Sequence, residues 1–242
     1  ELDQPVPARF VDFATSAVQG DLGKSYRNHV PVSDLIRRAL PVTLWLGFFA
    51  LTFAVVVGGL GGALAATRRG RLTDRIVSLV SAVALSVPPF VWAFALVVPF
   101  ALQRSWFPAT GYAKMSEGAG EWATHLALPS IALGLALAAE LARQTRAALV
   151  DNFERDFVRT ARANGLSRFA IWKHVLRNAS ITIVTVIGLQ STRVLGGVVV
   201  VEFVFALPGF GTLAYLAVLG RDLPVIQGAV VVSGVIIVLI NL

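Results

Sequence analysis

Few residues in this sequence have the types and spacing that chemistry requires. Gly23-Lys24-Ser25 matches the end of a phosphate-binding loop, G-x-x-x-x-G-K-S, but Val18 stands where the first glycine belongs and no strand precedes it. His29, His125 and His174 are too scattered to suggest a metal site, and the sequence has no cysteine, no H-E-x-x-H and no nucleophile motif. We therefore predict a chain that is not an enzyme and that holds neither a metal nor a cofactor.

The densest basic segment runs from Asp156 to Asn178, between two apolar runs. Up to Asn164, an apolar residue at every fourth position predicts a helix with one apolar face. The residues of that face are Phe153, Phe157 and Ala161. Gly165 can take the positive φ that ends a helix, and Ser167 can cap a second short helix. The sequence therefore predicts two short helices joined by a sharp elbow.

Two functions fit such a basic segment. Ala161 and Ala163 have small side chains that would let another protein's surface approach the backbone closely, which favours docking. The alternative is a basic loop that binds lipid headgroups or only fixes the topology of the chain.

Composition places the chain in a membrane. Of its 242 residues, 56% are hydrophobic and 14% are charged, and the mean hydropathy is +0.72, whereas a soluble domain needs more polar surface. Segments 67–76 and 143–178 carry 12 of the 21 lysines and arginines against four acids, and the other connecting segments carry eight of each. Because short basic loops stay inside the cell, loop 143–178 is predicted to be cytoplasmic. Topology explains the charge, and no nucleic-acid partner is expected.

Five apolar runs reach the length of about 20 helical residues that a bilayer requires. They are Pro41–Thr67, Val77–Leu102, His125–Val150, Ala179–Phe205 and the run from Pro224 onward. Gly58 and Gly62 form a G-x-x-x-G pair on which another helix can approach closely. In the second run, Ser86, Pro88 and Pro89 predict either a plain kink or part of the lining of a translocation path.

Charged residues inside these runs are costly in a membrane unless they have partners, and Gln190, Arg193 and Glu202 are further candidates for the path. Glu140 and Arg143 lie three residues apart and are predicted to form an ion pair. Gln190, Arg193 and Glu202 lie in the fourth run. Two partners fit Arg193: a carboxylate on another helix, or the carboxylate of a transported substrate such as a peptide C-terminus.

An ordered set of motifs resembles the permeases of ABC importers, most closely the dipeptide/oligopeptide branch. Residues 156–166 read D-F-V-R-T-A-R-A-N-G-L and residues 174–179 read H-V-L-R-N-A, where that branch has D-Y-V-R-T-A-R-A-K-G-L and H-x-L-R-N-A. Arg159 and Thr160 depart from the general EAA loop of such permeases, as this branch commonly does. Further matches are G-L-Q at 188–190, a glycine pair at 196–197, V-E-F-V-F at 201–205, P-G-F-G at 208–211 and D-L-P-V-I-Q-G at 222–228.

The resemblance implies an all-α integral membrane protein with a type I ABC importer-like helical bundle, of which five of six spans are visible. Residues 1–40 would be an extracytoplasmic segment, and in it the helical spacing of apolar residues independently predicts an amphipathic helix over residues 8–20. Residues 41–242 would be the transmembrane domain, with cytoplasmic coupling helices at 151–178. The ATPase-coupling residues would be Asp156, Arg159, Thr160, Ala161, Arg162, Ala163, Gly165 and Leu166.

The resemblance also implies partners. The chain would form a pore in the cell inner membrane with a second homologous permease subunit, two cytoplasmic ATPase subunits that hold ATP and Mg²⁺, an extracytoplasmic solute-binding protein and membrane lipid. It would import peptides or a related small solute, since relatives of this kind carry dipeptides, oligopeptides, nickel complexes, haem or glutathione. The alternative function is a secondary transporter or channel that works without ATPase subunits.

Overall fold

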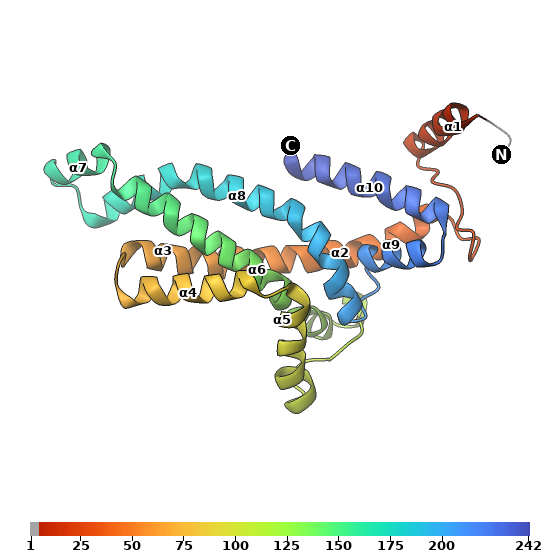
Figure 1. Cartoon of the computed structure of the whole chain (residues 1–242), viewed down its shortest axis with the longest axis horizontal. Coiled ribbons are helices and arrows are strands. Elements are labelled where there is room, and N and C mark those ends of the chain that lie inside the picture. The colour runs from red at the N-terminus through yellow and green to blue at the C-terminus, as the bar shows by residue number, and fades with distance from the viewer. Residues whose placement is uncertain (1–4) are drawn as a thin grey trace.

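The structure is a computed structural model, and it describes residues 5–242, which fold mainly into helices (Figure 1). The α-helices are α1 Val6–Val18, α2 Val32–Phe53, α3 Gly59–Thr67, α4 Leu72–Ser86, α5 Pro89–Leu96, α6 Ala119–Phe153, α7 Asp156–Ala163, α8 Arg168–Val204, α9 Phe210–Leu219 and α10 Leu223–Asn241. Two π-helical segments, η1 Ala54–Gly58 and η2 Val97–Gln103, and a 3₁₀ turn, η3 Met115–Glu117, complete the set. Within the described range, Lys24 and Pro31 form an isolated β-bridge.

The first span starts earlier than predicted. α2, η1 and α3 form one continuous helix from Val32 to Thr67, so Pro41 lies inside it and the expected boundary at residues 40 and 41 falls within a helix. Val32, Ile36 and Ala39 are buried in a cluster with residues of α9 and α10. This packing stabilises the amphipathic turns before the apolar run, which hydropathy alone does not detect.

The second span is broken rather than kinked. α4 and the helix formed by α5 and η2 meet at an angle of 105° at the break between Ser86 and Pro89, and α5 points away from the bundle in Figure 1. The prolines remove backbone donors here. Trp92 supplies one replacement, because its indole N–H donates to the carbonyl oxygen of Ala84 at 3.3 Å. The plain kink is therefore wrong, and the path-lining alternative stays a prediction.

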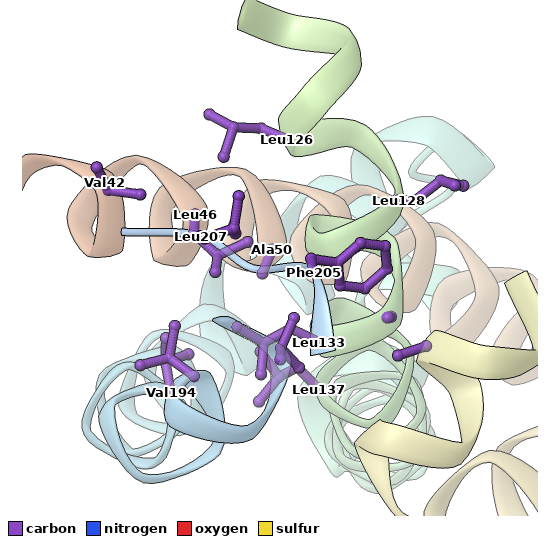
Figure 2. Close-up of a cluster of buried hydrophobic side chains, with 14 of the residues drawn as sticks. Val42, Leu46, Ala50, Leu126, Leu128, Leu133, Leu137, Val194, Phe205 and Leu207 are labelled. Carbon is purple, nitrogen blue, oxygen red and sulfur yellow. The ribbon is translucent and has the colours of Figure 1, made fainter. Parts of the chain in front are cut away.

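The central element is α6, which packs against α2, α3, α4, α5 and α8. Its apolar side chains meet those of α2 and α8 in the main buried cluster (Figure 2). The labelled members of that cluster are Val42, Leu46, Ala50, Leu126, Leu128, Leu133, Leu137, Val194, Phe205 and Leu207. In contrast, the apolar window of α8 is only 17% buried and that of α10 only 22%. These two helices leave wide faces free for lipid or another subunit.

The number of spans agrees with the sequence prediction. Four helices of the described chain are long and apolar enough to cross a membrane, and the bent pair of α4 and α5 makes a fifth. α1 confirms the helix predicted over residues 8–20, and it lies apart from the bundle in Figure 1. Residues 1–4 of the expected extracytoplasmic segment lie outside the described residues.

Candidate functional site

The elbow, residues 154–167, connects the ends of α6 and α8. α6 ends at Phe153, and the chain turns at Glu154 and Arg155 before α7 begins at Asp156. A single helix running to Asn164 is therefore wrong. Arg155 has extended backbone angles, φ −70° and ψ 152°, which no helix interior allows.

The other end of α7 follows the prediction. Gly165 has a φ of +74°. Its N–H bonds to the carbonyl of Arg162 at 3.0 Å, and the N–H of Leu166 bonds to the carbonyl of Ala161 at 3.1 Å. These two bonds make a Schellman motif, which satisfies carbonyls that the end of a helix leaves open. The glycine therefore fixes where α7 stops.

Ser167 caps the next helix as predicted, because its hydroxyl accepts a hydrogen bond from the N–H of Ala170 at 3.3 Å. That helix is not short. α8 continues without interruption for 37 residues, from Arg168 to Val204. The expected second coupling helix and fourth span are thus one continuous helix.

A small apolar cluster attaches α7 to the two long helices. Val158 is fully buried against side chains that include Leu149 of α6 and Val175 of α8. Phe153, Phe157 and Ala161 pack on the same cluster, as their spacing predicted. The apolar spacing in the sequence did not indicate that Val158 would be buried. The break at residues 154 and 155 changes the direction of the chain, so that the face of α7 beside Phe157 and Ala161 also packs against the bundle.

The outward side of the elbow is polar and free. Seven of the eight predicted coupling residues are exposed, and Ala161 is half-buried. Asp156 and Arg159 form a 3.5 Å ion pair with side chains 93% and 80% exposed, and such a surface pair contributes little to stability. These charges are therefore available to another molecule.

Two ion pairs connect the α3–α4 loop and the first turn of α4 to this end of the bundle. Arg69 pairs with Glu154 of the elbow. Arg146 of α6 pairs with Asp74 through two nitrogens, with Nη2 2.8 Å from Oδ2, and the N–H of Gly70 donates to the same carboxylate at 2.9 Å. Neither pair could be predicted from the sequence, in which only the clustering of charge is visible. Beside them lies a cleft of about 640 Å³. Its lining residues are Ala66, Thr67, Arg69, Val150, Phe153, Glu154, Arg162, Leu166, Arg168, Ile171 and Trp172.

Charged side chains of α6 and α8 make polar contacts within their own helices. Arg143 Nη2 lies 2.7 Å from Glu140 Oε2, which confirms the predicted pair. Arg193 Nη1 donates to Gln190 Oε1 at 3.3 Å. Across residues 5–242, the ion pairs within 4.0 Å do not include Arg193, so the structure supplies no cross-helix carboxylate for it.

Glu202 is fully buried. Its carboxylate accepts hydrogen bonds from the hydroxyl of Thr43 and, at 2.8 Å, from the N–H of Thr212. Thr43 in turn accepts from the N–H of Phe210 at 2.8 Å. In this way Glu202 connects α8, α9 and α2. At the α4–α5 break, Ser86 and Pro88 are exposed and Pro89 is half-buried. The assignment of these residues to a path stays a prediction.

Comparison with known proteins decides the family. The profile described as "Binding-protein-dependent transport system inner membrane component" matches residues 58–242. The chain belongs to this family. The probable peptide ABC transporter permease protein y4tP of Sinorhizobium fredii (strain NBRC 101917 / NGR234) is 39% identical to this inner membrane component over 242 residues, all of this chain and 77% of the relative. The glutathione transport system permease protein GsiC of Escherichia coli (strain K12) is 41% identical, again over the whole chain and 76% of the relative.

A solved structure shares the fold of this inner membrane component. A chain of the inward-facing MetNI methionine ABC transporter, in the CY5 native crystal form, superposes with a TM-score of 0.68 at 20% identity, covering 86% of this chain and 91% of that one. The protein is therefore a helical bundle of the type I ABC importer kind and a pore-forming permease of a binding-protein-dependent importer. Such a system includes a binding protein and an ATPase. Family membership leaves no support for a secondary transporter or channel.

Proposed function

We propose that this permease imports peptides, or a peptide-like solute such as glutathione, and that the elbow is where a cytoplasmic ATPase subunit binds. Relatives named as peptide and glutathione permeases support the solute class. The excess of basic residues in segments 67–76 and 143–178 supports a cytoplasmic position for the elbow. ATP and Mg²⁺ are held by the ATPase.

The observation that best supports this proposal is the position of α7 between two long helices, α6 and α8. α7 joins the end of α6, which packs against most of the bundle, to the start of α8. Val158 packs in the cluster that joins α7 to both helices, while the side chains of Arg159 and Arg162 are exposed. An ATPase pair that binds one pore conformation more tightly than the other, and does so only with nucleotide, shifts the equilibrium between the two conformations.

The exposed faces of α8 and α10 accommodate a second, related permease subunit and lipid. Two ATPase subunits bind the two elbows of such a pair. The opposite end of the bundle, which holds α9 and the segment around residues 20–31, receives the solute-binding protein. There Ser25 and the N–H of Tyr26 donate hydrogen bonds to Asp222, which fixes that surface.

Cysteine cross-linking tests the docking site, because the chain has no cysteine of its own. Ala163→Cys places a thiol on the exposed side of the elbow, and Ser116→Cys places one on η3, where the loop is exposed and expected to lie outside. In the intact complex, a maleimide that carries a photoreactive benzophenone is expected on illumination to join the first variant, but not the second, to an ATPase subunit. An impermeant maleimide added to cells should label only the second.

Uptake into vesicles tests the transport function. The complex is reconstituted with its binding protein, and uptake of radiolabelled trialanine and glutathione is measured. Uptake should require ATP and persist when an ionophore collapses ion gradients. Uptake that follows an ion gradient and ignores ATP, or an elbow thiol that reacts from outside the cell, contradicts the proposal.

A further inference from the structure

Arg193 is a cation set in an apolar helix face. It is the single ionisable residue between Ala179 and Val201 of α8. A guanidinium has five N–H donors, and among residues 5–242 this one has a single acceptor, Oε1 of Gln190 at 3.3 Å. A charged side chain at this depth is costly unless it meets a partner or a watery cavity. Arg193 therefore needs a binding partner that residues 5–242 do not supply.

The carboxylate of Glu140, which could balance the charge of Arg193, already accepts hydrogen bonds from other side chains. Glu140 of α6 lies close enough to interact electrostatically with Arg193. Its oxygens, however, accept from Arg143 Nη2 at 2.7 Å and from Gln144 Nε2 at 2.9 Å. Arg143 balances the charge of Glu140, so the group as a whole keeps one positive charge, and that charge is on Arg193.

The surroundings of Arg193 leave room for a ligand. Val194, the next residue, points into the core near Leu133 and Leu137 (Figure 2). Arg193 itself is exposed and lies on a stripe with Leu189, Gly196 and Val200, one or two turns away along α8. A Cβ built on Gly196 would meet no atom within 4 Å. On this exposed face, one cation beside one amide is free to hydrogen-bond one anionic group of a small solute.

We propose that Arg193 binds the carboxylate of the transported solute inside the translocation path, so that solutes with a free carboxylate, such as peptides with an unmodified C-terminus, are preferred by the permease itself. This inference rests on the proposed function. The planar fork of a guanidinium accepts a carboxylate through two parallel hydrogen bonds. Gln190 orients the fork by holding one N–H, and Arg143 keeps Glu140 from competing for it. Arg193 is thus a specificity-determining residue.

Uptake of an acid and its amide tests this role. The intact complex is reconstituted in vesicles with its binding protein, and ATP-driven uptake of trialanine is compared with that of trialanine amide, which lacks the terminal carboxylate. Calorimetry gives the occupancy of the binding protein for each solute, and uptake is compared at equal occupancy. Differences that arise in the binding protein are thereby removed.

Arg193→Gln is expected to slow uptake of trialanine about tenfold or more. Its effect on uptake of the amide should be less than about twofold. The reason is that losing a hydrogen bond to a charged group weakens binding by about ten- to a hundredfold. Arg193→Lys keeps the charge without the fork and should give an intermediate acid-to-amide ratio. Arg104→Gln is the matched control. Its guanidinium lies 4.9 Å from the Trp106 ring centre in an exposed loop, and the ratio should stay at the wild-type value.

Other outcomes overturn the proposal. An acid-to-amide ratio in Arg193→Gln equal to that of the wild type means that the guanidinium does not meet the solute. Equal slowing of both solutes, or failure of Arg193→Gln to assemble, means that Arg193 is paired with a carboxylate of another subunit. If the wild-type complex imports neither solute with ATP, the proposed function fails and this inference fails with it. Import by the wild type with an unchanged ratio in the variant overturns the inference alone.

Discussion

A Cβ built on Gly62 would stand 2.5 Å from the carbonyl oxygen of Ala142 on the neighbouring helix α6. One turn earlier, a Cβ on Gly58 would stand 2.4 Å from the carbonyl oxygen of Ala138. No side-chain carbon fits at these separations, so the backbones can meet this closely only while both positions are glycine. The G-x-x-x-G pair thus sets the distance between the first span and the central helix.

Adding a methyl group at this contact should destabilise the bundle. We expect Gly58→Ala and Gly62→Ala each to cost about 1–3 kcal/mol, as overpacking in a close-packed interior does. Gly59→Ala is the control, because a Cβ there meets nothing within 4 Å. The measurement is the fraction of complex that stays monodisperse after heating in detergent. Equal losses in the three variants would show that the close approach to α6 is not the cause.

The Asp74–Arg146 pair should matter far more than an exposed pair of the same type. The side chain of Asp74 is 7% exposed and that of Arg146 is 31% exposed. Arg146→Met leaves a nearly buried carboxylate without its cation and should cost about 3 kcal/mol or more. Arg159→Gln breaks the exposed pair with Asp156 and should cost at most about 1 kcal/mol.

Thermal unfolding of the reconstituted complex measures both variants. A double variant, Asp74→Asn with Arg146→Met, removes both charges and should recover part of the loss, because no unpaired charge is then buried. If Arg146→Met proves no more harmful than Arg159→Gln, the pair does not hold α4 to α6 in the membrane.

Gly165 should be needed for coupling because of its backbone rather than its contacts. Its φ is +74°, and a Cβ there meets nothing within 4 Å. A β-branched side chain is strained at this φ, whereas asparagine tolerates it. We expect Gly165→Val to raise the number of ATP molecules hydrolysed per solute imported several-fold, while Gly165→Asn stays near the wild type. Wild-type coupling in Gly165→Val would contradict the role of the elbow.

Asp222 should make the outer end of the bundle sensitive to acid. Burial alone would raise the pKa of this carboxyl, but hydrogen bonds from the Ser25 hydroxyl and the Tyr26 N–H outweigh burial and lower the pKa below its ordinary value of 3.8. Because the folded pKa is the lower one, the ionised group stabilises the fold above the unfolded pKa. That stabilisation is lost as the pH falls through the folded pKa.

Asp222→Asn should therefore lower the melting temperature of the complex at pH 6, and the difference from wild type should shrink as the pH falls below about 4. Asp12→Asn changes an exposed carboxyl of α1 and serves as the control at each pH. A difference that stays constant from pH 6 to below 4 would show that the charge of Asp222 does not contribute.

Features that depend on neighbouring residues could be predicted. Gly165 ends α7 with positive φ and Ser167 caps α8, because both depend on backbone groups within a few residues. Glu140 and Arg143 are three residues apart in one helix, so their ion pair follows from helix geometry. The number of spans follows from the length of the apolar runs. The start of α2 at Val32 could not be predicted in this way, since its stability comes from contact with α9 and α10.

The sequence by itself determined that this chain lies in a membrane, where its basic elbow sits between two spans, and which family motifs it carries. Only the tertiary structure decided which charged and polar side chains contact one another. Arg146 pairs with Asp74 across 72 positions, and Thr43 hydrogen-bonds Glu202 across 159, while no carboxylate of residues 5–242 forms an ion pair with Arg193. Hydropathy and spacing report the cost of burying a charge, but the compensating partner is set by how distant helices pack, and that depends on the whole chain.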